Sequence, residues 1–399
     1  MLGSALLVGA PGQALARPHR RGKGKGASTA AGAGSLDVAT TPLGTMPTSA
    51  RWAYIVDNNT GTVLLEKNAN ERMPPSSLTK MMTAYVVFTF LAAGRLSLDQ
   101  SLPVSDRAWR LQGSKMFVPQ GGSVKVSDLI QGMVVQSGND ACIVLAEGIA
   151  GSEERFAALM NQAAQRLGMN DTHFVNATGL PSPEHYMSAR DISVLARALL
   201  HDFPQYYHFF GEKEFTFNGI TQGNRNVLVL KDQADGFKTG HTDAGGFGLC
   251  ASSERPNGQG GKSRMIMVIN GTPSTNARAH EGERLMSWAF ANFSDVPLAQ
   301  KNRPVVPAAP VWMGTRPTVP LEPGVDYSAT LPADWRGMVS LKAHYDSPLV
   351  APLTAGQPCG SMDIFIKGQL VKTVPLVAAE DVPRAGLLER AMRRLRGHG

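Results

Sequence analysis

The order of periodic patterns along the chain constrains its fold more than any other feature. Strand-like and helical runs follow one another in the order 52–68 (strands), 72–88, 126–150, 152–168 and 188–203 (helices), 246–254 and 264–272 (strands), and 280–293 (helix). Strands, then helices, then strands favour helices packed on one antiparallel sheet, since a parallel sheet needs strands and helices that alternate. We therefore expect an α+β domain.

The N-terminal residues have a different composition. Residues 1–16 form a short apolar run that ends in Ala14-Leu15-Ala16, a cleavage pattern typical of an export signal, although no basic residues precede the run. Residues 17–48 are rich in Ala, Gly, Ser, Thr and Pro, which predicts a flexible leader. We expect the α+β domain to span 49–299.

The C-terminal part changes composition again near residue 300. The stretch 301–324 is too rich in proline for central strands or helices, and short apolar-polar alternations follow, so we expect a small all-β domain over 300–378. Within residues 379–399, Leu387, Leu388 and Leu395 fall on one helical face, and other faces carry Arg390, Arg393, Arg394 and Arg396. This pattern predicts an amphipathic helix on a membrane surface, with a helix docked on its own domain as the alternative.

The formal charge of +7 is concentrated near the two ends of the chain. Ten of the 39 Lys and Arg residues lie in 17–26 and 384–399, and only one of the 32 acidic residues does. The remaining body is close to neutral, which argues against a nucleic-acid-binding face. The three cysteines are widely separated, and we expect Cys142 and Cys250, both in apolar runs, to be buried free thiols.

A serine and a lysine three residues apart begin the first helical run, in "RMPPSSLTKMMTAYVVF". We expect the Ser76-Ser77 pair to cap a helix that starts near Leu78. Residues three apart on a helix share a face, so the Ser77 hydroxyl and the Lys80 amine can form a hydrogen bond. A buried lysine with a lowered pKa accepts a proton at neutral pH, which would activate the serine as a nucleophile.

Two further motifs follow in the chain. Ser137-Gly138-Asn139 interrupts an apolar helical region with polar groups that need partners, and a substrate can supply them. Lys238-Thr239-Gly240 begins a strand-like run that suits an anionic peptide terminus bound along a strand edge. The ordered set S-x-x-K, S-x-N, K-T-G is a signature of penicillin-recognising serine enzymes.

With these motifs, and with "NGITQGNRN" and "VPLVAAEDVP", the chain resembles the low-molecular-mass penicillin-binding proteins over roughly residues 45–395. These are serine D-alanyl-D-alanine carboxypeptidases with a C-terminal helical anchor. The resemblance implies a penicillin-binding/serine β-lactamase-like domain that removes the terminal D-alanine of peptidoglycan stem peptides and is acylated by penicillins. It also implies a periplasmic enzyme attached peripherally to the outer face of the cytoplasmic membrane.

The resemblance assigns a role to each motif residue. It implies that Ser77 is the acylated nucleophile, that Lys80 is its base and that Ser137 relays protons. Asn139 would hold a substrate amide, Lys238 and Thr239 would bind the terminal carboxylate, and Gly240 would belong to the same substrate-binding strand. The backbone N–H of His241 would form the oxyanion hole with that of Ser77. Arg278 falls where the family has an arginine near the carboxylate site, with an ordinary surface salt-bridge arginine as the alternative. Arg225 in "GNRN" is more readily explained as an ordinary surface arginine.

Several alternatives remain. Residues 165–180 contain no glutamate of the kind that serves class A β-lactamases as a deacylating base, so we expect slow release of β-lactams. A serine β-lactamase, a D,D-endopeptidase or a catalytically slow peptidoglycan-binding envelope protein would share the motifs. None of the nine histidines lies in an H-E-x-x-H motif, so we expect no metal and no other cofactor.

Overall fold

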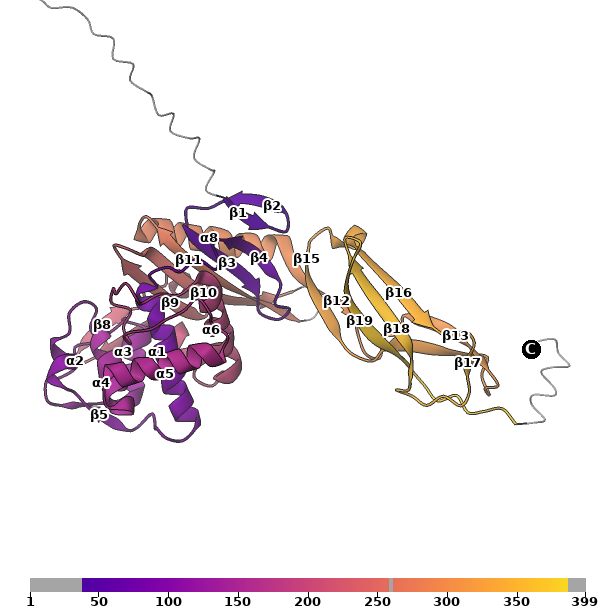
Figure 1. Ribbon diagram of the computed structural model, residues 1–399, viewed down its shortest axis with the longest axis horizontal. Coiled ribbons are helices and arrows are strands. Elements are labelled where there is room, and N and C mark those ends of the chain that lie inside the picture. The colour runs from indigo at the N-terminus through magenta and orange to yellow at the C-terminus, as the bar shows by residue number, and fades with distance from the viewer. Residues whose placement is uncertain (1–37, 258–260, 387–399) are drawn as a thin grey trace, which may run out of the picture. The chain divides into compact units, whose positions relative to one another are not determined.

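A computed structural model describes residues 38–257 and 261–386 of the chain. Its central feature is an antiparallel sheet in the order β2-β1-β4-β3-β11-β10-β9 (Figure 1). The strands are β1 (Val38–Thr41), β2 (Gly44–Pro47), β3 (Trp52–Asp57), β4 (Val63–Lys67), β9 (Gly236–Thr242), β10 (Gly246–Pro256) and β11 (Lys262–Thr272). The strand β9, which carries the K-T-G motif, lies at one edge of the sheet.

Helices form most of the segment between β4 and β9. They are α1 (Lys80–Ala92), α2 (Asp106–Arg110), α3 (Val126–Val134), α4 (Asn139–Ala150), α5 (Glu153–Arg166), α6 (Ala189–Asp202) and α7 (Val227–Leu230), and α8 (Thr275–Asn292) follows β11. Short 3-10 turns, η1 (Ser76–Thr79) and η2 (Tyr207–Gly211), and two small hairpins, β5 (Ser101–Pro103) with β6 (Ser123–Lys125) and β7 (Glu214–Phe217) with β8 (Ile220–Gly223), complete this part.

The two faces of the sheet belong to different cores. Along β3, Trp52, Tyr54 and Val56 pack with the helices α1 to α6. Ala53 and Ile55 pack instead with Leu285, Met286 and Ala289 of α8. Successive side chains of a strand point to opposite faces, so a strand buried on both faces reads as a continuous apolar run, as β3 does. The predicted fold class, helices packed on an antiparallel sheet, is confirmed.

Three local expectations are wrong. Residues 38–47, expected to be part of a flexible leader, form β1 and β2, and Thr40 of β1 pairs with Glu66 of β4. The Ser76-Ser77 pair makes no side-chain cap, and a 3-10 turn precedes α1. The strand-like run after Lys238 is two strands, β9 and β10, joined by a tight turn at Asp243–Gly245.

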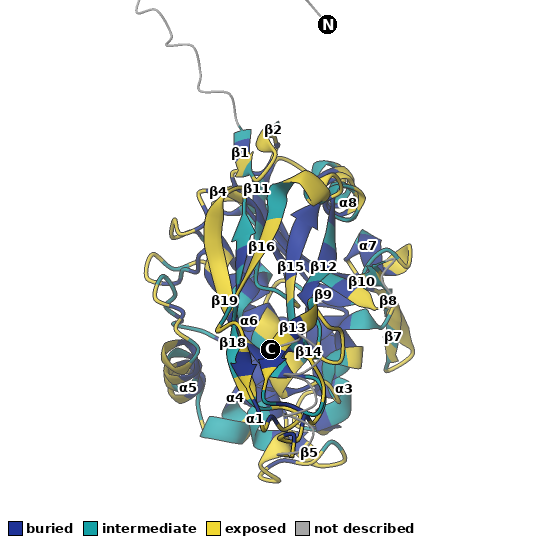
Figure 2. Cartoon of the chain, turned by 90° about the vertical axis from the view of Figure 1, so that its right-hand side faces the viewer, coloured by how far each residue is buried: buried dark blue, intermediate teal, exposed yellow. Residues whose placement is uncertain are grey.

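The C-terminal part is a separate β structure with its own apolar core. One sheet has the order β16-β18-β19-β14-β13-β17, and β12 pairs with β15. The bounds are β12 (Phe293–Ala299), β13 (Val306–Trp312), β14 (Thr318–Pro323), β15 (Tyr327–Pro332), β16 (Val339–Tyr345), β17 (Leu349–Val350), β18 (Pro358–Ile366) and β19 (Gln369–Ala378), with a 3-10 turn η3 (Trp335–Met338). The edge strand β16 is exposed over most of its length (Figure 2).

Proline behaves differently in this sheet from what the composition predicts. The proline-rich strands β13 and β14 lie inside the sheet order, but β17 pairs with β13 only at Val311 and Trp312, so the described stretch 306–310, which holds Pro307 and Pro310, pairs with β14 alone. Their pairing shifts register between Val306 and Ala309, and such irregularities let a strand keep residues that donate no ladder hydrogen bond. The β structure also begins at Phe293, so the boundary expected at residue 299 falls at the end of its first strand.

The segment that follows β19 is not helical where it is described. Leu353 bridges Val382 and Gly314 bridges Arg384, and the Ala385 N–H donates to the carbonyl of Met313. Residues 379–386 therefore extend along the β structure, which corrects the helix expected from residue 379. The rest of the predicted amphipathic helix, 387–399, lies outside the described residues. Among the described helices, none has the length and apolar character needed to cross a bilayer.

A loop of the catalytic part contacts the C-terminal β structure through polar groups. Asp57 is fully buried, and its Oδ1 accepts the N–H groups of Asn59 and Thr60 at 2.7 and 3.0 Å. The Asn59 amide donates at 2.8 Å to Asp295 of β12, which is 5% exposed. Asp57 and Asp295 thus form a buried carboxyl pair where the two parts of the chain meet.

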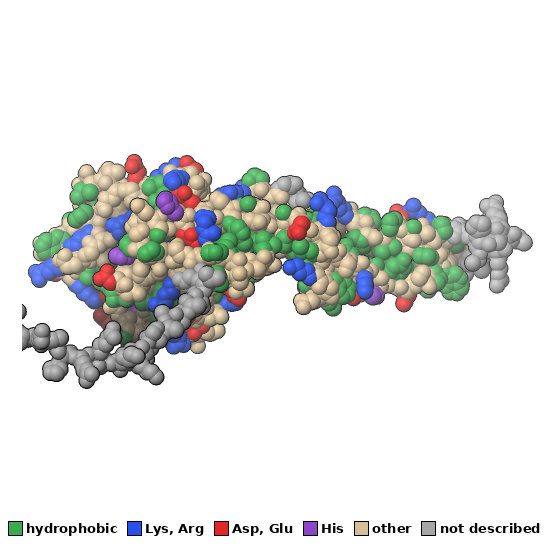
Figure 3. All heavy atoms as spheres, turned by 90° about the horizontal axis from the view of Figure 1, so that it is seen from above, with side chains coloured by type: hydrophobic (Ala, Val, Ile, Leu, Met, Phe, Trp, Pro, Cys, Tyr) green, Lys and Arg blue, Asp and Glu red, His purple; other side chains and the backbone are tan. Residues whose placement is uncertain are grey.

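All three cysteines are unlinked. Cys142 and Cys250 are buried as expected, and Cys359 is half-buried. On the face seen in Figure 3, basic and acidic side chains are interspersed over the surface.

Candidate functional site

The segment that carries Ser77 is held in an unusual conformation. Ser76 has a φ of +52°, and Ser77 follows it in the η1 turn. Gly179 packs so closely that a Cβ there would lie 1.8 Å from the carbonyl oxygen of Ser76. Only glycine fits at this position, so the turn and the Gly179 loop fix each other in place.

Lys80 begins α1 beside this turn and is fully buried. Its Nζ lies 2.9 Å from the Ser77 Oγ, 2.8 Å from the Asn139 Oδ1 and 2.7 Å from the carbonyl oxygen of Thr178. The predicted contact between serine and lysine is therefore confirmed. Burial lowers the pKa of Lys80 to about 8, because a charged amine loses its hydration there.

The S-x-N motif forms the break between α3 and α4. Ser137 has a φ of +63° and is buried, and its Oγ has no hydrogen-bond partner among the described residues. Asn139 begins α4, and its amide Nδ2 donates to the carbonyl of Gln112 at 3.0 Å. Both polar atoms of the Asn139 side chain therefore have protein partners, one of them Lys80, whereas we expected this side chain to be available to a substrate amide.

The K-T-G strand lies directly against the serine turn. A Cβ on Gly240 would lie 3.2 Å from the Ser77 nitrogen, so glycine lets β9 approach the nucleophile closely. Lys238 is 2% exposed, and in the part of the chain that the structure describes its Nζ makes a single long hydrogen bond, 3.3 Å, to the carbonyl of Thr239. Burial, and secondly the charge of Lys80, hold the pKa of Lys238 well below its usual range.

Two arginines extend this group of cations. Arg278 is 7% exposed, and its Nη2 donates at 3.4 Å to the backbone carbonyl of Arg225. Burial, and secondly the charge of Arg225, lower the pKa of Arg278 to about 10. Arg225 itself is exposed and donates to the Ser114 hydroxyl at 2.7 Å. The side chain of His241 stacks on Phe247 with ring centroids 3.9 Å apart.

Four cations line the cleft: Lys80, Lys238, Arg225 and Arg278. Within the described parts of the chain, none of the four forms an ion pair. Burying several like charges without counter-ions is costly. An anion that enters the cleft relieves this cost, so the arrangement is suited to binding a carboxylate.

The sequence analysis missed two residues that shape the site. The Thr178 carbonyl binds Lys80 from 98 residues away, and the sequence "NATG" gave only a turn-like signal. Asp140, directly after the S-x-N motif, is buried and accepts the backbone N–H groups of Met116, Phe117 and Val118 at 2.9 to 3.2 Å. Its carboxylate fixes the loop beside the cleft, and an acidic residue in the first turn of α4 was the available signal.

Family models match both parts of the chain. Residues 39–273 match the model of peptidase family S11, D-alanyl-D-alanine carboxypeptidase, and residues 293–384 match the C-terminal domain of penicillin-binding protein 5. The carboxypeptidase DacC of Escherichia coli (strain K12) is 40% identical over 353 residues, 86% of each chain. The carboxypeptidase DacA of the same strain is 37% identical over 89% of each chain.

Solved structures agree with these matches. Penicillin-binding protein 5 from Haemophilus influenzae superposes with a TM-score of 0.69 at 34% identity, covering 85% of this chain and 99% of that one. Penicillin-binding protein D2 from Listeria monocytogenes, solved in the ampicillin-bound form, superposes with a TM-score of 0.55 at 30% identity. It covers 61% of this chain and 97% of that one.

Proposed function

The chain belongs to the D-alanyl-D-alanine carboxypeptidase family, and from this premise we propose that Ser77 is its acylated nucleophile and Lys80 the base that activates it. The substrate would be a peptidoglycan stem peptide that ends in D-Ala-D-Ala. The Ser77 Oγ attacks the carbonyl between the two D-alanines and gives its proton to the Lys80 amine. The terminal D-alanine leaves, and water hydrolyses the ester.

The hydrogen-bond partners of Lys80 carry this proposal. A neutral amine has two N–H groups and one lone pair. The Asn139 Oδ1 and the Thr178 carbonyl can only accept, so they take the two N–H groups. The lone pair is then left for the remaining neighbour, the Ser77 hydroxyl at 2.9 Å. This hydroxyl can donate its proton, which is the geometry of a general base beside its nucleophile.

The other motif residues would complete the reaction. The backbone N–H groups of Ser77 and His241 would hold the oxyanion, where such donors contribute several kcal/mol, about 3 for a single donor. The partnerless hydroxyl of Ser137 would pass a proton to the leaving amine. Lys238, Thr239 and Arg278 would bind the terminal carboxylate, because this wall of the cleft is cationic.

Penicillins would acylate the same serine, and the enzyme would release them slowly. Among the described residues, neither Ser77 nor Lys80 hydrogen-bonds to a carboxylate, so no separate base activates the deacylating water. Mass spectrometry after exposure to penicillin should show one adduct, on Ser77. The Ser77→Ala variant should show none and should release no D-alanine. An adduct on that variant would contradict the assignment. Faster turnover of a β-lactam than of a D-Ala-D-Ala peptide would favour a β-lactamase.

We also propose where the enzyme is located in the cell. The export pattern in 1–16, the amphipathic pattern in 387–399 and the named relatives support a periplasmic enzyme attached to the cytoplasmic membrane through its C-terminal segment. A chain that ends at Gly386 should keep its peptidase activity and move from the membrane to the soluble fraction. If the shortened chain stays with the membrane, another surface anchors it.

A further inference from the structure

The most exposed tryptophan of the chain lies on the C-terminal β structure. Trp312, the last residue of β13, is 51% exposed, and Val350, with which it pairs on β17, is 58% exposed. The preceding pair, Val311 and Leu349, belongs to the apolar core. Because side chains alternate along a strand, two further exposed residues share the outward face. We call this face the exit patch, and its members are Pro310, Trp312, Val350 and Pro352.

The exit patch differs from the other exposed apolar side chains. Single exposed apolar residues are normal on a protein surface. Of the large apolar side chains in the described residues, however, only Trp312, Val350 and Leu370 are more than half exposed, and the first two are register partners. No member of the patch carries a charge. An indole ring with a polar N–H is suited to the headgroup layer of a bilayer, which is apolar on one side and wet on the other.

The last described residues lie beside the exit patch. The Ala385 N–H donates at 2.9 Å to the carbonyl of Met313, the residue after Trp312, and the Thr315 N–H donates at 2.8 Å to the carbonyl of Pro383. Figure 1 shows β13 and β17 together at the end of the β structure where the described chain stops. The chain therefore enters the segment 387–399 from a point next to the patch.

The charges at this point favour an anionic partner. Residues 384–399 hold five arginines and one glutamate. The first of these arginines, Arg384, is exposed and forms no ion pair with the residues that the structure describes, whereas Arg316 is paired with Glu380. Basic residues near a membrane attract its anionic headgroups, and apolar contact adds to the binding in proportion to the area that it buries. An anionic lipid surface therefore suits both the arginines and the apolar patch beside them.

We infer that the exit patch is a second membrane-contact surface, on which Trp312 and Val350 enter the headgroup layer of an anionic bilayer. This inference rests on the proposed attachment of the enzyme to the cytoplasmic membrane through the segment 387–399. It adds a contact outside that segment, on the folded β structure. It also identifies the end of the β structure that faces the lipid.

The first test measures the binding of the full chain to vesicles of phosphatidylethanolamine and phosphatidylglycerol. The Trp312→Ser/Val350→Ser variant should bind about tenfold more weakly, because it no longer buries this apolar area. Leu370→Ser is the matched control, since Leu370 is 54% exposed but lies near the start of β19, eight residues before that strand ends at Ala378. It should bind like the unmodified chain. Release of D-alanine from a soluble peptide should be equal in all three proteins.

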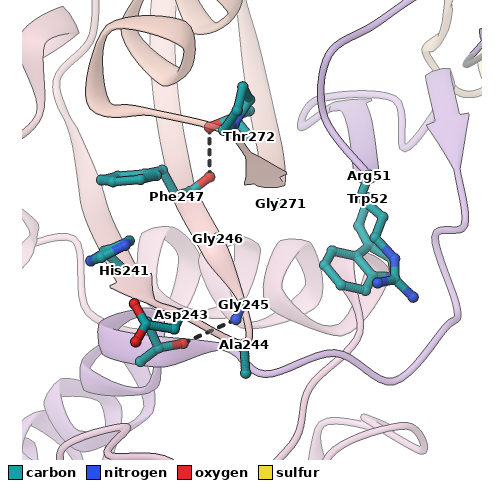
Figure 4. Close-up of a pocket in the computed structure, with 12 residues that line it drawn as sticks. Arg51, Trp52, His241, Asp243, Ala244, Gly245, Gly246, Phe247, Gly271 and Thr272 are labelled. Carbon is teal, nitrogen blue, oxygen red and sulfur yellow. Dashed lines mark hydrogen bonds between the residues drawn. The ribbon is translucent and has the colours of Figure 1, made fainter. Parts of the chain in front are cut away.

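The second test asks whether lipid touches Trp312 directly. Bromine atoms on lipid acyl chains quench the fluorescence of tryptophans that lie close to them. Subtracting the emission of the Trp312→Phe variant isolates the Trp312 signal from that of the other tryptophans, such as Trp52, which is buried under the Arg51 guanidinium (Figure 4). This signal should lose most of its intensity when the vesicles contain brominated lipid.

Two outcomes overturn the exit patch while the unmodified chain still binds the vesicles. One is equal binding of the unmodified chain and the double variant. The other is a Trp312 signal that brominated lipid leaves unchanged, which would mean that the segment 387–399 or another part of the chain covers the patch. If the unmodified chain does not bind the vesicles at all, the proposed membrane attachment fails together with the patch. Acylation of Ser77 by penicillin tests the proposed reaction independently of all these results.

Discussion

The protein buries two pairs of like charges, and it treats them in opposite ways. In the cleft, the amines of Lys80 and Lys238 have lowered pKa values because burial disfavours the ammonium form. Where the two parts of the chain meet, burial and the neighbouring Asp295 carboxyl group raise the pKa of Asp57 to about 7. We therefore expect the carboxyl pair to hold one proton between its two members, because burial and the neighbouring carboxylate favour the protonated form of Asp57.

In the described part of the cleft, no neighbouring group compensates the charge of the lysine pair in this way. Within the described residues, Lys80 has three well-placed partners, but Lys238 has only one long hydrogen bond. A buried like-charge pair that lacks hydrogen bonds is therefore expected where a ligand supplies the missing partner. A pair whose hydrogen bonds are nearly complete serves the structure instead. Substitutions in the two pairs should therefore separate activity from stability.

The largest effect is expected at Lys80. Penicillin should acylate the Lys80→Ala variant about 10³-fold more slowly, which is within the range that general bases contribute. The reason is that no other amine or carboxylate contacts Ser77 in the described structure. Stopped-flow labelling with a fluorescent penicillin measures the rate, and circular dichroism checks that the fold persists. Labelling at the normal rate would remove Lys80 from the mechanism.

Lys238→Met should separate activity from stability. We expect kcat/KM for a D-Ala-D-Ala peptide to fall about 100-fold, since a buried carboxylate loses its cation. The free energy of unfolding should rise by about 1 kcal/mol, because the substitution removes a buried amine with a single weak hydrogen bond. Peptidase assays and urea denaturation give the two quantities. A variant that loses both activity and stability would show that the lysine supports the fold.

The pH dependence of acylation should follow the Lys80 amine. Only the neutral amine accepts a proton, so the rate should rise about tenfold per pH unit up to about pH 8 and then level off. The same shift affects stability. The folded state loses this proton near pH 8 and the unfolded state near 10.5, so stability should rise with pH between these values. A flat rate profile from pH 6 to 8 contradicts the assignment.

The smallest effect is expected at the carboxyl pair, and it has the opposite sign. The folded state keeps the proton of Asp57 up to about pH 7, whereas the unfolded state loses it near 3.8. This group therefore lowers the free energy of unfolding as pH rises from 3.8 to 7, by at most about 1.4 kcal/mol per pH unit. In Asp57→Asn an amide N–H replaces the shared proton, so this slope should flatten.

Urea denaturation at several pH values checks the Asp57 prediction, with Asp99→Asn as the control. Asp99 is almost fully exposed, so its removal should leave the slope as it is. Equal slopes in the unmodified protein and in Asp57→Asn would mean that no proton is shared at this contact.

Sequence predicted what depends on local spacing. The contact between Ser77 and Lys80 was predicted for an α-helix, and it forms although Ser77 lies in a 3-10 turn. Side chains three residues apart share a face in both kinds of helix. The strand β3 was equally predictable from the sequence, because burial on both faces of the sheet leaves an unbroken apolar run.

Partners that are distant in sequence could not be predicted. The Thr178 carbonyl completes the surroundings of Lys80, and any residue has a carbonyl, so no residue type marks it. Asp57 and Asp295 are more than 200 residues apart, and each alone is an ordinary acidic residue. Residues 38–47 were misjudged because their small side chains resemble a linker, whereas pairing with β4 orders the backbone.

The unlinked cysteines have a practical consequence. Burial raises the pKa of Cys142 to about 12 and raises that of Cys250 as well. Thiols in this state scarcely react with alkylating reagents at neutral pH. Their modification therefore reports the opening of the interior, and a reducing buffer leaves the folded protein unaffected because no bridge exists to be broken.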